Sequence, residues 1–474
     1  MKNKLGLIFL GYLRVLAKIQ TAKINLVRIL SGQKRITVVG ITGSMGKTSI
    51  MLAAAAALKD SFKIKYSSRA NSETGIPLDI LGLSMRNYSL LDWFRVALLS
   101  PIKLITNWKT YDLYLVEMGV DEPDEPKNMS YLLKIIWPRI GVFSGVTSVH
   151  SMQFEKAVDP NLSPIRKLKA VKKAIADEKG KMITALPEDG FAILNCDDRL
   201  VRQTGKKTKA KVIEIGGGDK PTVKIISTAV SLRGTTFSYQ IDSYHLRSQV
   251  LMLNRGKRYQ LKMKGFVLPK VYGVNFGLAI GVGLALGVDP ERAISGIKKH
   301  FKMPPGRSSL LRGMKNTLII DSSYNASPKA VLAMLDLLER LGKRSGRKKL
   351  AVLGDMRELG SQSKMEHQKI AKKTAAVADE IVLVGKEMFE YFLPAVVEEG
   401  FKKGNIHHFL TAFQAAEFLK KNLHGEELVL VKGSQNTIFL EIVVEALMKD
   451  RRKADFLLCR RGAFWERKRG ELRV

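Results

Sequence analysis

The sequence lacks the features that define several large protein classes. Its 474 residues include only two cysteines, Cys196 and Cys459, which excludes a disulfide framework or a four-cysteine zinc site and indicates a reducing compartment. Aromatic residues make up only 7%, and we find no internal repeats or low-complexity segments. Neither residues 1–30 nor the apolar run 271–286 reaches the ~20 uninterrupted apolar residues of a transmembrane helix. We therefore expect a globular protein with two or three domains.

Acidic residues are also scarce. There are 44 Asp and Glu against 79 Lys and Arg, which gives a net charge of +35. Such an excess is found in proteins that bind nucleic acid, anionic lipid or nucleotide-linked substrates. Here the charge is spread along the chain, with concentrations at 166–173, 202–211 and 451–473, which favours a general solubility effect over one dedicated surface. No nucleic-acid-binding module is recognisable, so we expect no specific nucleic acid partner.

Residues 1–33 are predicted to form one basic amphipathic helix. Basic residues interrupt its apolar residues at Arg14, Lys18, Lys23 and Arg28. This pattern is typical of a helix in the interface of an anionic membrane, and equally of a helix packed against its own protein. We expect a cytoplasmic protein, with peripheral membrane contact through this helix as one of the two interpretations.

The strongest motif is RITVVGITGSMGKTS at residues 35–49. A β-branched run predicts a strand, two glycines predict a tight turn, and the alanine-rich run that ends near Leu58 predicts a helix. In such a phosphate loop, backbone N–H groups hold phosphate oxygens, the lysine neutralises the outer phosphates and the threonine ligates Mg²⁺. Ile41 stands where the usual pattern has its first glycine, so the loop is a variant. The residues expected to bind the nucleotide here are Gly43, Ser44, Gly46, Lys47, Thr48 and Ser49.

Two later strands are predicted to end in side chains suited to this site. The run 111–119 is apolar and carries Glu117 near its carboxyl end, from where the carboxylate can hold the Mg²⁺ that Thr48 ligates. The run 139–150 ends at His150. From the sequence alone, a ligand role and a structural role are equally expected for this histidine. A lysine-rich helix is expected at 167–182, in which periodicity singles out no lysine.

The order of the predicted elements indicates an α/β protein. Residues 34–302 predict a P-loop-type ATPase domain with a mostly parallel sheet, to which the alternating runs in 205–265 add a small antiparallel β-layer. The sequence MPPGR at 303–307 marks a boundary. Residues 303–450 alternate strand and helix again, which predicts a Rossmann-like C-terminal domain, and 451–474 form a basic tail.

Six short motifs are spread along the chain: TGSMGKTS (42–49), NSETGIP (71–77), EMG (117–119), SYNASP (323–328), VLGDMRELG (352–360) followed by His367, and VKGS (431–434). Taken together, these motifs resemble those of the Mur ligase family, the ATP-dependent amide-bond ligases of peptidoglycan synthesis. The resemblance spans about residues 35–445 and is closest to the MurF branch, which joins D-alanyl-D-alanine to UDP-N-acetylmuramoyl-tripeptide.

The resemblance implies roles for individual residues. One Mg²⁺ is implied between Thr48, Glu117 and the phosphates, and a second near His150 and a carbamylated lysine. Lys179 matches that lysine best, with Lys181 and Lys173 as alternatives. The implied catalytic residues are Lys47, Lys179 and His150. The other implied contacts are Asn71 and Asn275 at the adenine, Arg307 and Asp321 at the ribose and phosphates, and Tyr324 and Asn325 at the substrate.

The sequence departs from the family pattern at two places. Ser322 follows Asp321 where MurF proteins commonly have paired aspartates, and only residues 1–34 precede the ATPase strand, where the family has a UDP-binding domain. We still expect a monomeric, MurF-like ligase that uses ATP and Mg²⁺ and forms an acyl phosphate. One alternative is a Mur-like ligase for a lipid-linked or poly-amino-acid acceptor. An alternative from another class is a nucleic-acid-associated P-loop ATPase.

Overall fold

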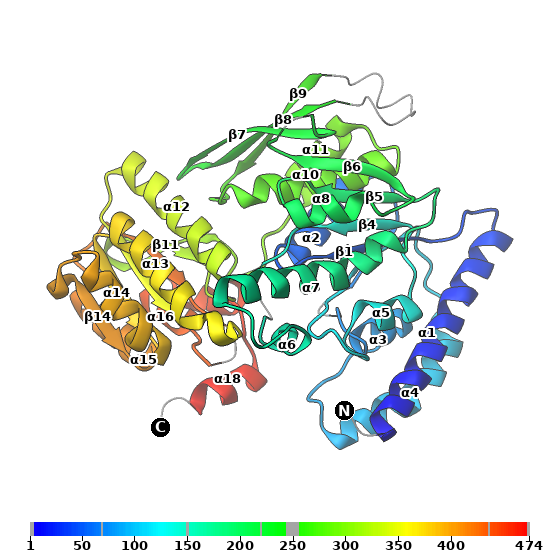
Figure 1. Ribbon diagram of the computed structural model, residues 1–474, viewed down its shortest axis with the longest axis horizontal. Coiled ribbons are helices and arrows are strands. Elements are labelled where there is room, and N and C mark those ends of the chain that lie inside the picture. The colour runs from blue at the N-terminus through cyan, green and yellow to red at the C-terminus, as the bar shows by residue number, and fades with distance from the viewer. Residues whose placement is uncertain are drawn as a thin grey trace. The chain divides into compact units, whose positions relative to one another are not determined.

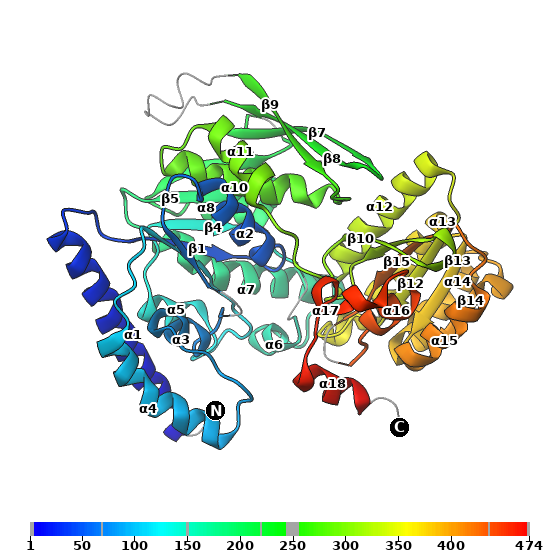
Figure 2. The same cartoon turned by 180° about the vertical axis from the view of Figure 1, so that it is seen from behind.

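The computed structural model describes residues 4–67, 70–147, 151–218, 220–242, 256–434 and 437–471. The chain divides into two compact units (Figures 1 and 2). Unit 1 comprises Met1–Ser227, Ser238–Leu261 and Gly273–Phe301, and unit 2 comprises Thr228–Phe237, Lys262–Tyr272 and Lys302–Val474.

The first sheet has nine strands in the order β2-β3-β1-β4-β5-β6-β7-β8-β9. All neighbours from β2 to β7 run parallel, which confirms the predicted mostly parallel sheet. The predicted antiparallel strands continue this same sheet as a hairpin, in which β7 and β8 are joined by a short turn. The strands are β1 (Thr37–Thr42), β2 (Ile64–Tyr66), β3 (Leu113–Glu117), β4 (Ile140–Phe143), β5 (Phe191–Asn195), β6 (Lys211–Gly216), β7 (Val223–Ser231), β8 (Gly234–Ile241) and β9 (Lys257–Lys264).

Strand β1 lies inside this sheet, between β3 and β4. Ile41 pairs with Glu117 of β3 and with Val142 of β4, so the three strands end at one edge. Val39, Ile41 and Val142 are fully buried, as expected for a parallel strand covered on both faces. The strand begins two residues later than the sequence predicts, because pairing with its neighbours starts at Thr37.

Helices cover the first sheet, and the alanine-rich helix is one of the most deeply buried. Ala53 to Ala57 are buried, and α11 approaches so closely that a Cβ on Gly296 would lie 2.6 Å from the Ala56 carbonyl oxygen. The alanines therefore allow a close helix contact as well as helix formation. The helices are α1 (Lys4–Leu30), α2 (Lys47–Leu58), α3 (Gly75–Leu81), α4 (Leu90–Thr106), α5 (Met129–Ile135), α6 (Ser151–Phe154), α7 (Pro164–Thr184), α8 (Arg199–Gly205), α10 (Val271–Ala285) and α11 (Pro290–His300).

The second sheet belongs to unit 2 and has six strands in the order β10-β11-β15-β12-β13-β14. Only β10 is antiparallel to its neighbour, which confirms the predicted second α/β sheet. The elements are β10 (Ser309–Arg312), β11 (Leu318–Asp321), α12 (Pro328–Ser345), β12 (Lys349–Gly354), α13 (Ser363–Val377), β13 (Glu380–Val384), α14 (Leu393–Glu398), β14 (Ile406–Phe409), α15 (Ala412–Asn422), β15 (Leu428–Lys432), α16 (Glu441–Leu447), α17 (Ala454–Leu457) and α18 (Ala463–Gly470).

The basic segment that follows α16 packs onto unit 2. Ala454 and Leu458 join the hydrophobic core formed by β15 and α16. Arg460 is buried and forms a bidentate ion pair with Glu441, at 2.7 and 2.8 Å. Among the described residues, no helix is both long enough and apolar enough to cross a membrane.

Candidate functional site

The loop between β1 and α2 has the backbone of a phosphate cradle. Gly43 and Gly46 both have positive φ, 136° and 81°. A Cβ on Gly46 would lie 2.7 Å from Asn275 Oδ1, and one on Gly43 would lie 2.0 Å from Ser144 Oγ. Both positions therefore require glycine for conformation and for space.

The segment after β4 holds this loop in place. The Ser44 N–H donates to the Gly145 carbonyl at 2.9 Å, and the Ser144 hydroxyl donates to the Met45 carbonyl at 2.6 Å. The Thr147 N–H in turn donates to Ser44 Oγ at 3.1 Å. The cradle is thus preorganised by contacts within the protein, and Ser44 contributes to its shape.

Lys47 and Thr48 begin α2 next to the cradle. Lys47 Nζ donates to the Gly43 carbonyl at 2.9 Å, so the ammonium group lies over its own loop. Thr48 is half-buried in the first turn of the helix, where the backbone N–H groups and the helix dipole attract anions. The fully buried Ser49 lies deeper in the same turn.

Glu117 is the last residue of β3 and is largely buried. Its partner in register is Ile41 of β1, so its carboxylate lies at the edge of the sheet where the phosphate loop begins. The Glu117 N–H donates to Ser67 Oγ at 3.1 Å. His150, the other predicted ligand at a strand end, lies outside the described residues.

The three candidate lysines of α7 differ sharply in environment. Lys179 is only 1% exposed, and its Nζ donates to the Val120 carbonyl at 2.8 Å. Burial, and next the positive charge of Lys47, lower the pKa of Lys179 to about 7. Lys181 and Lys173 are exposed and form ion pairs with Glu178 and Asp177, at 2.6 and 2.7 Å. Lys179 is therefore the lysine of this group that faces the phosphate loop.

Two asparagines that the family resemblance singles out lie against glycines of unit 1. Asn275, on α10, is buried against Gly46 of the phosphate loop. The Asn71 carbonyl accepts from the Gly119 N–H at 2.8 Å, and a Cβ on Gly119 would lie 3.2 Å from Asn71 Nδ2. The structure thus brings Asn275 to the cradle and Asn71 to the segment that follows Glu117.

The donors at the cradle fit a hard cation. Thr48 offers a hydroxyl and Glu117 a carboxylate, the oxygen ligands that Mg²⁺ prefers. Within the described part of the chain, no three His, Cys, Asp or Glu side chains gather into a metal-binding group. Of the implied Mg²⁺ ligands, Glu117 is the only carboxylate or histidine within the described residues. The phosphates of ATP would complete the coordination.

Unit 2 holds a second cluster of predicted site residues, around Tyr324. The Arg307 guanidinium lies 4.3 Å from the centre of the Tyr324 ring, a cation–π contact. Arg460 donates to the Tyr324 carbonyl at 2.7 Å and to the Ser323 carbonyl at 2.8 Å. Asn325 is exposed, and its Oδ1 accepts from the Ala326 N–H at 2.8 Å.

Asp321 and Lys432 are buried in the same cluster. Asp321 Oδ1 accepts from the Ser323 N–H at 3.0 Å, whereas Oδ2 has no hydrogen-bond partner among the residues that the structure describes. Burial raises the pKa of Asp321 to about 6. Lys432 Nζ donates to the Asn325 carbonyl at 2.7 Å, and burial together with the charge of Arg307 lowers its pKa to about 7. Two ionisable groups with strongly shifted pKa values in one cluster are typical of functional sites.

Sequence reasoning missed Lys432 and Arg460. Lys432 ends the fully buried strand LVLVK and stands in the motif VKGS, so a lone lysine after an apolar run was the available signal. Arg460 gave no such signal, because it stands among many basic residues. His367 has a structural role: its Nε2 accepts from the Met356 N–H at 3.1 Å, which leaves the proton on Nδ1 for the Ser363 carbonyl at 2.8 Å.

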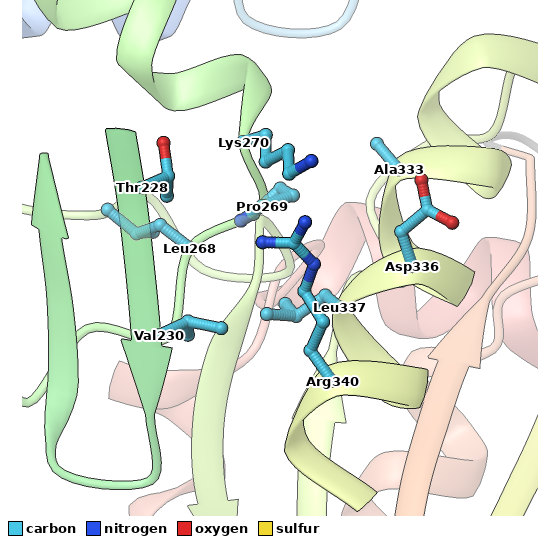
Figure 3. A pocket seen from close by; sticks show the side chains of 9 residues that line it. All are labelled: Thr228, Val230, Leu268, Pro269, Lys270, Ala333, Asp336, Leu337 and Arg340. Carbon is cyan, nitrogen blue, oxygen red and sulfur yellow. The ribbon is translucent and has the colours of Figure 1, made fainter. Parts of the chain in front are cut away.

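A small pocket of unit 2 lies apart from these residues (Figure 3). It is lined by Thr228, Val230, Leu268, Pro269, Lys270, Ala333, Asp336, Leu337 and Arg340, none of which is a predicted site residue. Nearby, Arg344 donates to the Val230 carbonyl at 3.1 Å. The side chains around the pocket therefore serve mainly to pack α12 against β7 and the segment 267–270.

Comparisons with known proteins agree with the motifs. The model of the Mur ligase glutamate ligase domain matches residues 306–435. The UDP-N-acetylmuramoyl-tripeptide:D-alanyl-D-alanine ligase of Buchnera aphidicola is 24% identical over 450 residues, which cover 92% of this chain and 81% of the relative. The corresponding ligase of Escherichia coli is 25% identical over 423 residues, which cover 87% and 77% of the two chains.

The fold points the same way. The crystal structure of the MurF ligase of Thermotoga maritima in complex with ADP matches with a TM-score of 0.67 at 21% identity, over 93% of this chain and 84% of that one. At this identity the likeness shows the fold. Residues 306–435 thus match the glutamate ligase domain of Mur ligases, and the chain as a whole is similar to MurF ligases at about 25% identity.

Proposed function

We propose that this protein is a MurF-type ligase that joins D-alanyl-D-alanine to the terminal carboxylate of UDP-N-acetylmuramoyl-tripeptide. The observation that carries the proposal is the pairing of a preorganised phosphate loop with a buried lysine of lowered pKa beside it. The substrates are those of the MurF relatives in the comparisons.

The first step would activate the carboxylate. A carboxylate oxygen forms a bond to the γ-phosphorus of ATP, the bond between that phosphorus and the β–γ bridging oxygen breaks, and ADP leaves. Charge moves toward the β-phosphate in this step, where Lys47 and the N–H groups of the cradle are placed to stabilise it. The product is an acyl phosphate, whose leaving group is phosphate instead of oxide.

The second step would form the amide bond. The amine of the dipeptide attacks the acyl carbon, the amine loses a proton, and the tetrahedral intermediate expels inorganic phosphate. Because water would otherwise hydrolyse the acyl phosphate, the reaction needs both substrates held in place before activation. We propose that Arg307 and Lys432 bind anionic parts of the substrates, with Tyr324 and Asn325 as further contacts.

Mg²⁺ at this site would neutralise phosphate charge and polarise the phosphoryl oxygens. Thr48 and Glu117 are the described residues that would hold it. We propose that the neutral amine of Lys179 attacks CO₂, forms an N–C bond and releases a proton to solvent. The product is a carbamate, an anion that can hold a second cation. A pKa of about 7 leaves much of this amine uncharged near neutral pH, as the reaction with CO₂ requires. His150 and the lysine carbamate complete the proposed second site.

The test is phosphate release from ATP with UDP-N-acetylmuramoyl-tripeptide, with and without D-alanyl-D-alanine, in Mg²⁺ and bicarbonate. We expect turnover only when both are present, together with a product of the mass of the pentapeptide. L-alanyl-L-alanine is the matched control for the incoming amine. Turnover with a lipid-linked or poly-amino-acid acceptor instead would assign the alternative ligase, and stimulation by DNA would assign the nucleic-acid-associated ATPase. ATP turnover that depends on neither substrate would reject the proposal.

A further inference from the structure

The outward faces of α1 and α4 form an apolar surface on unit 1. The two helices lie side by side at its edge in both views (Figures 1 and 2). They contact each other through the Phe9 and Trp93 rings, 5.3 Å apart edge to face, and through the Tyr12 hydroxyl, which donates to the Ala97 carbonyl at 2.9 Å. Lys23 lies 4.3 Å from the centre of the Trp108 ring. The pair is therefore one packed structural feature.

The inward faces of the helices explain how they are held. Helix α1 buries Leu10, Leu13, Ala17 and Ile24 and packs against α3 and α5. Helix α4 buries far less of its surface: along its whole length only Asp92, Val96 and Ser100 are buried. One face of α4 is thus open to solvent.

The outward faces are apolar instead of polar. On α4, Phe94 is 65% exposed and Ile105 is 71% exposed, and Leu98 and Ile102 continue the same stripe at helical spacing. The stripe on α1 is longer and has the same character. Its exposed apolar residues are Leu7, Ile8, Val15, Ile19, Leu26, Ile29 and Leu30. An exposed apolar surface of this extent on a folded protein marks an interaction site.

The charges around this surface are almost all positive. Residues 4–35 contain seven Lys and Arg and no acid, and residues 84–110 contain four Lys and Arg and a single acid, Asp92. Asp92 pairs with Arg95 at 2.7 Å, so these two charges cancel. Arg28 is buried and pairs with Asp112 at 2.8 Å, so it adds no charge to the surface either. The basic residues that remain keep the surface positive. The aromatic residues Tyr88 and Trp108 flank the two ends of α4, and both are exposed. Apolar stripes, a basic rim and aromatic residues at the ends are the combination that binds the interface of an anionic bilayer.

We propose that α1 and α4 together form a surface that binds anionic phospholipid bilayers, with the apolar stripes inserted among the lipids and the basic residues at the headgroups. The sequence left open whether α1 faces a membrane or its own protein. The structure shows that one face of α1 packs inward while the other remains exposed, and α4 adds a second apolar stripe beside it. A second copy of the chain fits this surface less well, because two such faces would bring like charges together.

The experiment is sedimentation of the full chain with vesicles of phosphatidylglycerol and phosphatidylcholine, or of phosphatidylcholine alone, with light scattering of the free protein. We expect binding to the anionic vesicles only, weakened by salt. The triple variant Phe94→Glu, Ile102→Glu, Ile105→Glu should bind about tenfold or more weakly. The assay uses no ligase substrate, so its result is independent of the proposed function.

A matched control introduces the same change at exposed apolar residues of unit 2. The triple variant Met365→Glu, Leu410→Glu, Phe456→Glu should bind the vesicles as the unchanged protein does. Circular dichroism checks that both triple variants fold. Undiminished vesicle binding by the α4 variant, or no binding by the unchanged protein, would overturn the proposal. The unchanged protein could instead form a dimer and not bind vesicles, while the α4 variant is monomeric. That result would assign the surface to a second copy and would likewise overturn the proposal.

Discussion

Lys179 lies within the electrostatic influence of Lys47, the lysine of the phosphate loop. Burial is the main cause of the lowered Lys179 pKa, and the charge of Lys47 is the next largest. Lys179 Nζ is held by the Val120 carbonyl, three residues beyond Glu117 at the end of β3. Two lysines, one from the loop and one from α7, are thus directed to one edge of the sheet, where an anionic ligand would stabilise both.

Lys47→Ala should abolish ATP turnover. The change removes the cation placed to stabilise the outer phosphates, and loss of such a group lowers kcat by about a hundredfold or more. Phosphate release measures the effect. Lys59→Ala, at the far end of the same helix and exposed, is the matched control and should retain activity. An active Lys47→Ala protein would rule out the phosphate-cradle role.

Lys179→Gln should also lower turnover by about a hundredfold, because glutamine cannot form a carbamate. Lys181→Gln and Lys173→Gln change exposed, ion-paired lysines of the same helix and should have little effect. Removal of CO₂ and bicarbonate should slow the unchanged enzyme and leave the slow Lys179→Gln variant as it is. Equal activity of the three variants would contradict the role of Lys179.

Gly46→Ala should destabilise unit 1 by about 1–2 kcal/mol from backbone strain, and further through the close contact with Asn275. Gly287→Ala is the matched control, since Gly287 also has positive φ, 76°, but has no atom within 4 Å of the added Cβ. Urea unfolding measures both. Gly46→Ala should lower the free energy of unfolding by more than Gly287→Ala does. In an Asn275→Ala background this difference between the two variants should disappear. A difference that persists there would show that Asn275 is not its source.

Lys432→Met should remove a pH dependence of stability. The pKa of Lys432 is about 7 in the folded protein and near 10.5 in the unfolded chain, so the unfolded chain binds more protons between these values. Stability of the unchanged protein should therefore rise with pH in this window, with a contribution of up to about 1.4 kcal/mol per pH unit from this residue.

Unfolding in guanidinium chloride at pH 7, 8 and 9 measures this slope. Lys432→Met should be flatter than the unchanged protein, whereas Lys364→Met, a change at an exposed lysine of unit 2, should keep the slope. Equal slopes for Lys432→Met and the unchanged protein would show that burial does not suppress the charge of Lys432.

Local patterns in the sequence were sufficient for the elements and for the cradle. The β-branched run, the two glycines and the alanine run specify strand, turn and helix through short-range sterics, and α2 begins at Lys47 because Gly46 takes a left-handed conformation. Alternation of strands and helices likewise predicted both sheets, since parallel strands need helical crossovers.

Only the tertiary structure decided which side chains face inward. The lysines of α7 look alike in the sequence, and the packing of the helix alone buries Lys179 and exposes Lys181 and Lys173. Arg460 stands in a basic run, yet it is buried by its pair with Glu441, nineteen positions earlier in the chain. The apolar surface on α1 and α4 was also hidden, because amphipathicity shows that a helix has an apolar face and does not show what covers it. Burial depends on neighbours that are distant in sequence, and those neighbours exist only in the folded chain.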